Sequence, residues 1–378
     1  MRRCGPSRPS RWLVGAAAAV ALSLAGCSAA APPAGSGTRP AAPVRPWSHR
    51  LLLTGTFTEV ASAGDVLYLL ETLPHRAQPM QLLVRVDLRT GTVGYARELV
   101  PVFGTPIVVS PSGVWLLGWA WLSQNAERAG PLTLYRFDPD TLRLISRRTV
   151  GPAGCCQQAT LSGWTGGRLW LSVGSVVRLI QPVPWTVLQT VRIRDGQVRW
   201  LSFSPDRRRV YLAVAPTGAG HGAALQEQAL QERALPGWRL LHVGTVSATL
   251  NVGPISAAGA ALWVTAGGGT TGQIQLFTAD LSHVRLVLGA GELARSPAEK
   301  HFFAFENGVG AAVLEGVTWL TAQNALACLQ PDTGRVLAEQ PGDQTHGPSI
   351  TMDPVAVHGD LYGLSADGLV QLRPPAVC

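Results

Sequence analysis

The sequence is poor in charged residues and almost lacks lysine. Asp, Glu, Lys and Arg make up 14% of the 378 residues, and Lys300 is the only lysine. Disordered chains carry more charge and fewer apolar residues than the 46% found here, so the composition excludes a largely disordered protein. The 42 Gly and 28 Pro would interrupt most helices but suit many strands joined by turns, which disfavours a helical protein.

Long apolar runs are also scarce, which excludes a bundle of transmembrane helices. The one marked run, residues 12–24, is too short to span a bilayer comfortably. It follows Arg2, Arg3, Arg8 and Arg11 and ends in small residues, so it predicts a secretory signal.

Small residues stand directly before a cysteine at the end of this run, in the order Leu24, Ala25, Gly26 and Cys27. This order resembles the lipobox of bacterial lipoproteins, and the resemblance implies diacylation of Cys27 and cleavage before it. The alternative is an ordinary signal peptide with a chance cysteine. Residues 28–46 are rich in Ala, Pro and Gly and cannot form a core.

These features predict three segments: a lipoprotein signal peptide (1–26), a disordered tether (27–46) and a folded body (47–378). The expected location is the outer face of the cytoplasmic membrane, with the lipid anchor as the membrane contact. The whole chain has a net charge of +8, but a product starting at Cys27 has 27 basic and 23 acidic residues, or +4. Because Arg and Asp recur without a basic block, we expect no nucleic-acid binding.

Four cysteines remain in the body: Cys155, Cys156, Cys328 and Cys378. An exported chain permits disulfides, and four cysteines allow three pairings. Adjacent cysteines make strained bridges, so we expect Cys155 and Cys156 to pair with distant cysteines rather than with each other. The sequence contains no Cys-x-x-Cys or His-x-x-x-His spacing, and we expect no metal site.

One short pattern recurs through the body: a turn, usually with Gly, followed by a β-rich run with an aromatic residue between aliphatic ones. The seven copies are 64–69, 113–116, 167–171, 209–212, 259–264, 316–320 and 359–363, and their aromatics lie 47, 55, 41, 52, 56 and 43 residues apart. This period is typical of propeller blades. We therefore predict an all-β fold, a seven-bladed β-propeller with four-stranded blades.

The ends of the repeat array predict how the ring closes. The last copy offers only three strands before Pro374 and Pro375, and residues 51–57 supply a spare strand before the first copy. Pairing the two would remove both exposed edges. Residues 223–233 have helical propensity, but the period predicts the third strand of the fourth blade there.

The repeats resemble seven-bladed propellers of the YVTN and quinoprotein-like type, and more loosely those of the streptogramin lyases. The resemblance rests on the Asp-x-x-Thr-Gly turn at 87–91 and on the strands at 167–170 and 261–264. Quinone-binding relatives need a tryptophan-docking pattern after the Thr-Gly turn. No such pattern follows Gly91 or Gly334, so we expect no quinone and no other cofactor.

Loops on one face of a propeller surround its central channel, and binding residues concentrate on such loops. The candidate ligand-binding residues at this channel mouth are Trp119, Trp121, Gln157, Gln158, Asn251, Glu306, Asn307, Asp343 and His346. The two tryptophans would either stack on a ligand or pack between blades. His346 and Asp343 would form an acid/base pair or remain solvated.

Catalytic signatures are missing: there is no Gly-x-Ser-x-Gly elbow, no His-Glu-x-x-His and no Walker loop. We therefore assign no catalytic residue. The favoured hypothesis is a non-catalytic, membrane-anchored propeller that binds an envelope protein or a small molecule. The alternative is a streptogramin-lyase-like, metal-assisted lyase or hydrolase with its site at the channel mouth.

Overall fold

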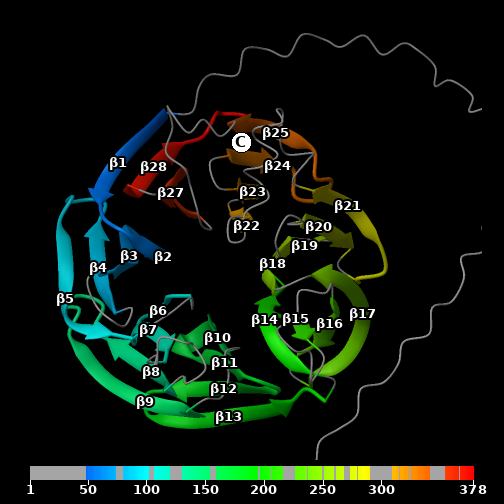
Figure 1. The fold of residues 1–378 in the computed structure, drawn as a ribbon, viewed down its shortest axis with the longest axis horizontal. Helices are drawn as coiled ribbons and strands as arrows, with labels where there is room; N and C mark the ends of the chain where they lie inside the picture. Colours follow the sequence, from blue (N-terminus) through cyan, green and yellow to red (C-terminus); the bar gives the residue numbers. More distant parts are fainter. Residues whose placement is uncertain are drawn as a thin grey trace, which may run out of the picture. The chain divides into compact units, whose positions relative to one another are not determined.

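Almost all of the described chain is extended strand in the computed structural model (Figure 1). The structure describes residues 48–73, 80–101, 106–119, 130–153, 159–194, 196–204, 206–215, 226–235, 237–248, 251–258, 261–267, 273–278, 280–289, 309–314, 316–322, 325–340, 354–365 and 367–378. They belong to one unit, Val44–Cys378. No helix within these ranges has the length and apolarity needed to cross a membrane. The only helical element described is η1 (Thr165–Gly167), a 3-10 turn, and the all-β prediction is confirmed.

Hydrogen bonding groups the described strands into seven four-stranded antiparallel sheets, which confirms the predicted blade architecture of four antiparallel strands. The first three sheets are β2 (Phe57–Ala63), β3 (Val66–Thr72), β4 (Gln81–Asp87), β5 (Val93–Val100); β6 (Val108–Ser110), β7 (Gly113–Gly118), β8 (Pro131–Phe137), β9 (Leu144–Ala153); and β10 (Ala159–Gly163), β11 (Leu169–Val173), β12 (Val176–Pro182), β13 (Trp185–Arg192). The fourth to sixth are β14 (Gln197–Phe203), β15 (Arg209–Ala215), β16 (Gln226–Ala234), β17 (Arg239–Ala248); β18 (Asn251–Ala258), β19 (Ala261–Gly267), β20 (Gln273–Thr278), β21 (Val284–Gly289); and β22 (Val309–Leu314), β23 (Val317–Ala322), β24 (Ala325–Leu329), β25 (Val336–Gln340). The last sheet combines β26 (Val355–Val357), β27 (Asp360–Ser365) and β28 (Gly368–Arg373) with β1 (Ser48–Thr54).

The N-terminal strand completes the last sheet. β1 runs antiparallel to β28, with Ser48 opposite Arg373 and Thr54 opposite Gly368. The spare strand has the expected length but lies three residues earlier than the predicted 51–57, because the chain turns at Gly55 and Phe57 already begins β2. Gly368 is required here: its φ is 144°, and a Cβ would lie 1.9 Å from the carbonyl oxygen of Leu53.

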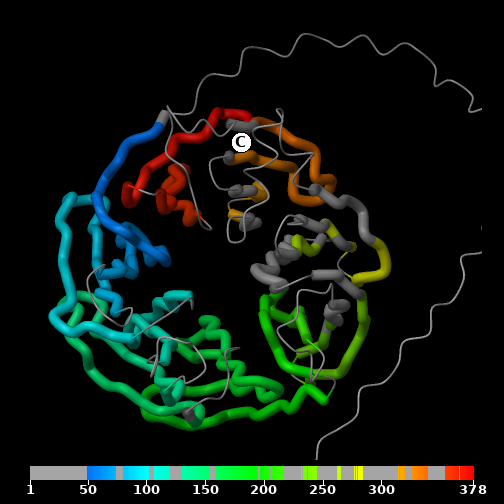
Figure 2. Tube along the Cα trace, in the orientation of Figure 1, coloured from blue at the N-terminus to red at the C-terminus, as the bar shows by residue number. Residues whose placement is uncertain are grey.

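Apolar side chains fill the spaces between neighbouring sheets. Leu70 of β3 packs with Leu116 of β7 in the layer between the first and second sheets, whereas Leu69 of β3 packs with Leu364 of β27 between the first and last. Successive residues of a strand point to opposite faces, and here both faces are buried, so the inner strands are continuously apolar. The trace passes from sheet to sheet in sequence order, and the blue and red ends lie side by side (Figure 2).

The aromatic residue of each copy is buried, and in three copies a described contact of its side chain reaches the following sheet; Trp115 Nε1 instead donates within its own sheet, to Oγ of Ser110 at 3.1 Å. The Tyr68 hydroxyl donates to the carbonyl oxygen of Pro139 at 3.0 Å, and Trp263 Nε1 donates to that of Pro331 at 3.0 Å. Trp170 packs edge-on against Trp238 with ring centroids 5.2 Å apart. All three partners lie in the turn between the third and fourth strands of the next sheet, so the repeated aromatic is an inter-sheet contact.

The segment with helical propensity is a strand, as the repeat period predicted. β16 pairs with β15 on one side and with β17 on the other, as the third strand of the fourth sheet. Two ladders of backbone hydrogen bonds satisfy its N–H and C=O groups, which outweighs the weak local preference for helix.

Candidate functional site

The connections between strands differ sharply at the two ends of the sheets. We call the end where the first and second strands, and the third and fourth, are connected the turn face. Its connections span two to six residues. The opposite end, the loop face, has connections of up to 19 residues, between β21 and β22, and 14 residues, between β25 and β26.

At the turn face, side chains of neighbouring turns contact each other and link adjacent sheets. Nε2 of His358, beside β26, pairs with the carboxylate of Asp65, beside β2, and so joins the last sheet to the first. The guanidinium of Arg207 lies over the ring of Trp164, 5.1 Å from its centroid, and so joins the fourth sheet to the third.

Aspartates fix several of the longer turns on this face, at Asp87, Asp138, Asp206 and Asp280. The backbone N–H groups of Thr90 and Arg89 donate to Asp87 Oδ1 at 3.0 and 3.1 Å, and Gly91 has a φ of 72°. The Thr90 N–H is the largest of the influences that hold the pKa of Asp87 below its ordinary value. The Asp-x-x-Thr-Gly motif therefore has the structural explanation of a hydrogen-bonded turn.

A buried polar group lies at the loop-face end of the first sheet. The Gln81 side chain is 1% exposed, and its Nε2 donates to Oγ1 of Thr58 at 2.6 Å and of Thr72 at 3.2 Å. Burial raises the pKa of the neighbouring Glu71 carboxyl, which favours its neutral form. This group provides hydroxyl, amide and carboxyl functions beside the connection 73–80 between β3 and β4.

Gln81 and Thr58 were not among the residues predicted from the sequence to form a site. The available signal was Gln81 itself, a polar residue at the start of the otherwise apolar run of β4. A buried polar side chain needs partners, so its position predicts other polar groups nearby.

Two of the predicted channel-mouth residues fall in the described part of the chain. Asn251 begins β18 opposite Gly267, at the loop-face end of the fifth sheet. Trp119 follows β7 and is only 8% exposed, because it packs in the layer between the second and third sheets with Leu132 and Leu161. Trp119 therefore serves packing between sheets and does not offer a free ring for stacking.

The remaining candidates lie outside the described residues. They are Trp121, Gln157, Gln158, Glu306, Asn307, Asp343 and His346, together with Cys27, Cys155 and Cys156. In the described ranges, no three His, Cys, Asp or Glu side chains gather as metal ligands would.

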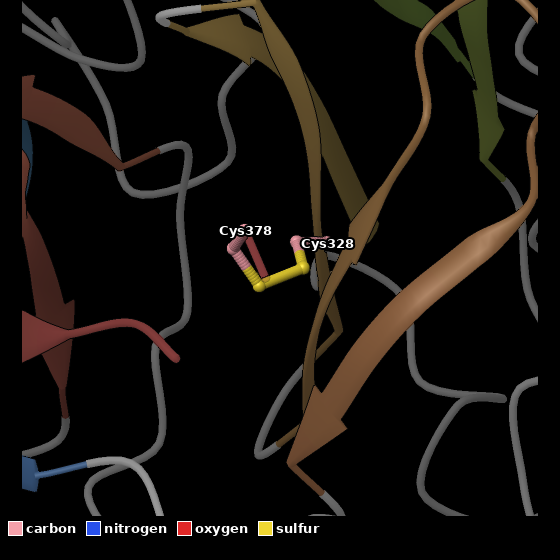
Figure 3. Close-up of a disulfide and its surroundings, with 2 residues drawn as sticks. All are labelled: Cys328 and Cys378. Carbon is pink, nitrogen blue, oxygen red and sulfur yellow. A yellow bond between two sulfur atoms is a disulfide. The ribbon is translucent and has the colours of Figure 1, made fainter. Parts of the chain in front are cut away.

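One disulfide joins the last two sheets. Cys328 of β24 is bonded to Cys378, the final residue, and the two Cα atoms are 6.0 Å apart (Figure 3). Cys328 is fully buried, in a core layer that also contains Leu361 and Leu372 of the last sheet. Of the three pairings that the sequence allows, this bond excludes the two that join Cys155 and Cys156 to Cys328 and Cys378. The expectation that Cys155 and Cys156 pair with these distant cysteines is therefore wrong.

Comparison with known proteins identifies the fold only. No protein-family model and no curated protein sequence matches this chain. The solved structure described as "Structure of Dos1 propeller" is similar, with a TM-score of 0.56 and 9% sequence identity, over 87% of this chain and 95% of that one. At so low an identity the similarity concerns architecture alone, and the chain is a β-propeller.

Proposed function

We propose that this protein is an exported, lipid-anchored propeller whose loop face binds an envelope protein or a small molecule without catalysis. The seven sheets would form one closed, seven-bladed ring of the YVTN type. The lipid on Cys27 would hold it at the outer face of the cytoplasmic membrane.

The proposal that the loop face binds a partner rests on the difference in connection length between the two faces. The long connections, of up to 19 residues, join strand ends at the loop face, and the sheets between them pack through continuous core layers. Such loops on a rigid scaffold are where binding residues concentrate. The connections of the turn face span only two to six residues, and turns such as 87–92, 138–143 and 330–335 contain their own backbone hydrogen bonds.

The Cys328–Cys378 disulfide supports export. Disulfides persist in oxidising compartments and are rare in reducing ones. Export also agrees with the signal-like segment and with the lipobox-like residues 24–27.

The direction of β1 suits an anchored binding protein. Ser48, the first residue of β1, lies at the turn face, and Thr54 lies at the loop face. A tether that ends at Ser48 therefore joins the propeller at the end opposite to its long loops, which leaves the loop face open to a partner.

The anchor can be tested by the intact mass of the full chain expressed in a bacterium that processes lipoproteins. We expect detergent-extracted membranes to yield a species that begins at Cys27 and carries a diacylglyceryl group on its thiol. The Cys27→Ser variant should lack this species. A mature chain that begins at another residue, or an unmodified Cys27, would contradict lipid anchoring.

A further inference from the structure

A basic pocket lies where β1 and β28 pair, at the edge of the last sheet. Its volume is about 320 Å³, and it is lined by His49, Arg50, Gln371 and Arg373. This size falls within the range of small-molecule sites. Ser48 opposite Arg373 marks the turn-face end of this strand pair, so the pocket is close to where the chain joins the propeller.

Two of the four side chains that line the pocket are held by one carboxylate. Asp360 of β27 accepts a hydrogen bond from Gln371 Nε2 at 2.7 Å and one from Arg373 Nε at 3.3 Å. Within the described part of the chain, no acidic side chain forms an ion pair with Arg50 or His49. Two guanidinium groups and an imidazole therefore share a pocket with one carboxylate, and the fixed charges of Arg50, Arg373 and Asp360 sum to +1.

The two guanidinium groups of the pocket both lie near the buried phenol of Tyr362. Burial raises the pKa of Tyr362 and Asp360 adds to the rise, whereas Arg373 and Arg50 both oppose it. Both guanidinium groups thus act on one neighbouring side chain.

Basic residues are rare in the C-terminal part of the chain, so the basic pocket is not the result of a generally basic composition there. Residues 301–378 contain eight acidic residues and only two basic ones, Arg335 and Arg373. Arg50 reaches the pocket only because the N-terminal strand completes the last sheet. Two cations gathered at one strand pair suit an anionic ligand.

We infer that this pocket binds a singly charged phosphate, the phosphodiester of a membrane phospholipid headgroup. Guanidinium groups bind phosphate oxygens through charge-assisted, often bidentate hydrogen bonds. A net pocket charge of +1 matches a phosphodiester better than the more highly charged inorganic phosphate. This inference rests on the proposed function, since the anchor would bring this end of the strand pair to the bilayer.

The test uses the full chain with Cys27→Ser, in a neutral detergent, titrated by calorimetry with dihexanoyl phosphatidylglycerol below its critical micelle concentration. We expect saturable binding that weakens with salt and falls at least tenfold in Arg50→Gln/Arg373→Gln. The matched control is Arg89→Gln/Arg335→Gln, which removes two exposed arginines of the turn face outside the pocket and should change the affinity less than twofold.

Inorganic phosphate is the second probe. Binding of it as tight as that of the lipid would assign the pocket to free phosphate and overturn the headgroup inference. Absence of lipid binding, or equal loss in both double variants, would overturn it as well. Because the tested chain lacks the acylation site, failure of lipid anchoring would leave these results unaffected, so the two proposals fail separately.

Discussion

Replacing Trp263 by alanine should lower the free energy of unfolding by about 3–5 kcal/mol, the range for large buried aromatic residues. Trp263 is fully buried, and its Nε1 donates to Pro331 in the turn of the next sheet. The truncation leaves a cavity between the fifth and sixth sheets and an unpaired carbonyl oxygen. Denaturant-induced unfolding followed by far-UV circular dichroism measures the loss.

The Trp263→Phe variant separates packing from hydrogen bonding. It keeps most of the buried ring and removes only the N–H donor, so we expect a loss of about 1–3 kcal/mol, mainly from the unpaired carbonyl. A loss below 1 kcal/mol for Trp263→Ala would contradict the role of the repeated aromatic as an inter-sheet contact.

Removing the disulfide should lower the free energy of unfolding by about 4 kcal/mol. Cys328 and Cys378 are 50 residues apart, and the loop-entropy relation gives this value for a loop of that length. The bond ties the end of the chain, just after β28, to the sixth sheet, so its loss frees the last sheet from its neighbour. Unfolding of Cys328→Ser/Cys378→Ser in guanidinium chloride measures the effect.

The reductant response is the control for this prediction. Dithiothreitol should destabilise the wild-type protein by a similar amount and should affect the double variant much less. If the reductant destabilised both proteins equally, the Cys328–Cys378 disulfide would not be the bond responsible for the stabilisation.

The strands and turns of the repeats could be predicted because their causes are local. The turn from Asp87 to Gly91 needs one carboxylate and one residue with positive φ, and both lie within these five consecutive residues. Continuous apolar runs such as that of β3 indicate strands buried on both faces. The pairing of β1 with β28 followed from counting strands, since a sheet edge without a partner is unfavourable.

The candidate sites were harder to predict from the sequence because they depend on residues far apart in the chain. Arg50 and Arg373 share a pocket only through the pairing of the two ends, and neither has a distinctive sequence context. Trp119 was ambiguous for a similar reason: a tryptophan at the end of a strand packs or stacks according to what the next sheet presents to it.

Photo-crosslinking tests most directly whether the loop face is the binding surface. A photoreactive residue would replace Asp367 or Arg194, both exposed at loop-face connections, or Arg89 or Arg335, both exposed at turn-face connections, in the full chain in bacterial membranes. We predict that the two loop-face probes capture the same partner or ligand and that the two turn-face probes do not. Capture of that partner from the turn face alone, or no capture from the loop face, would contradict the account.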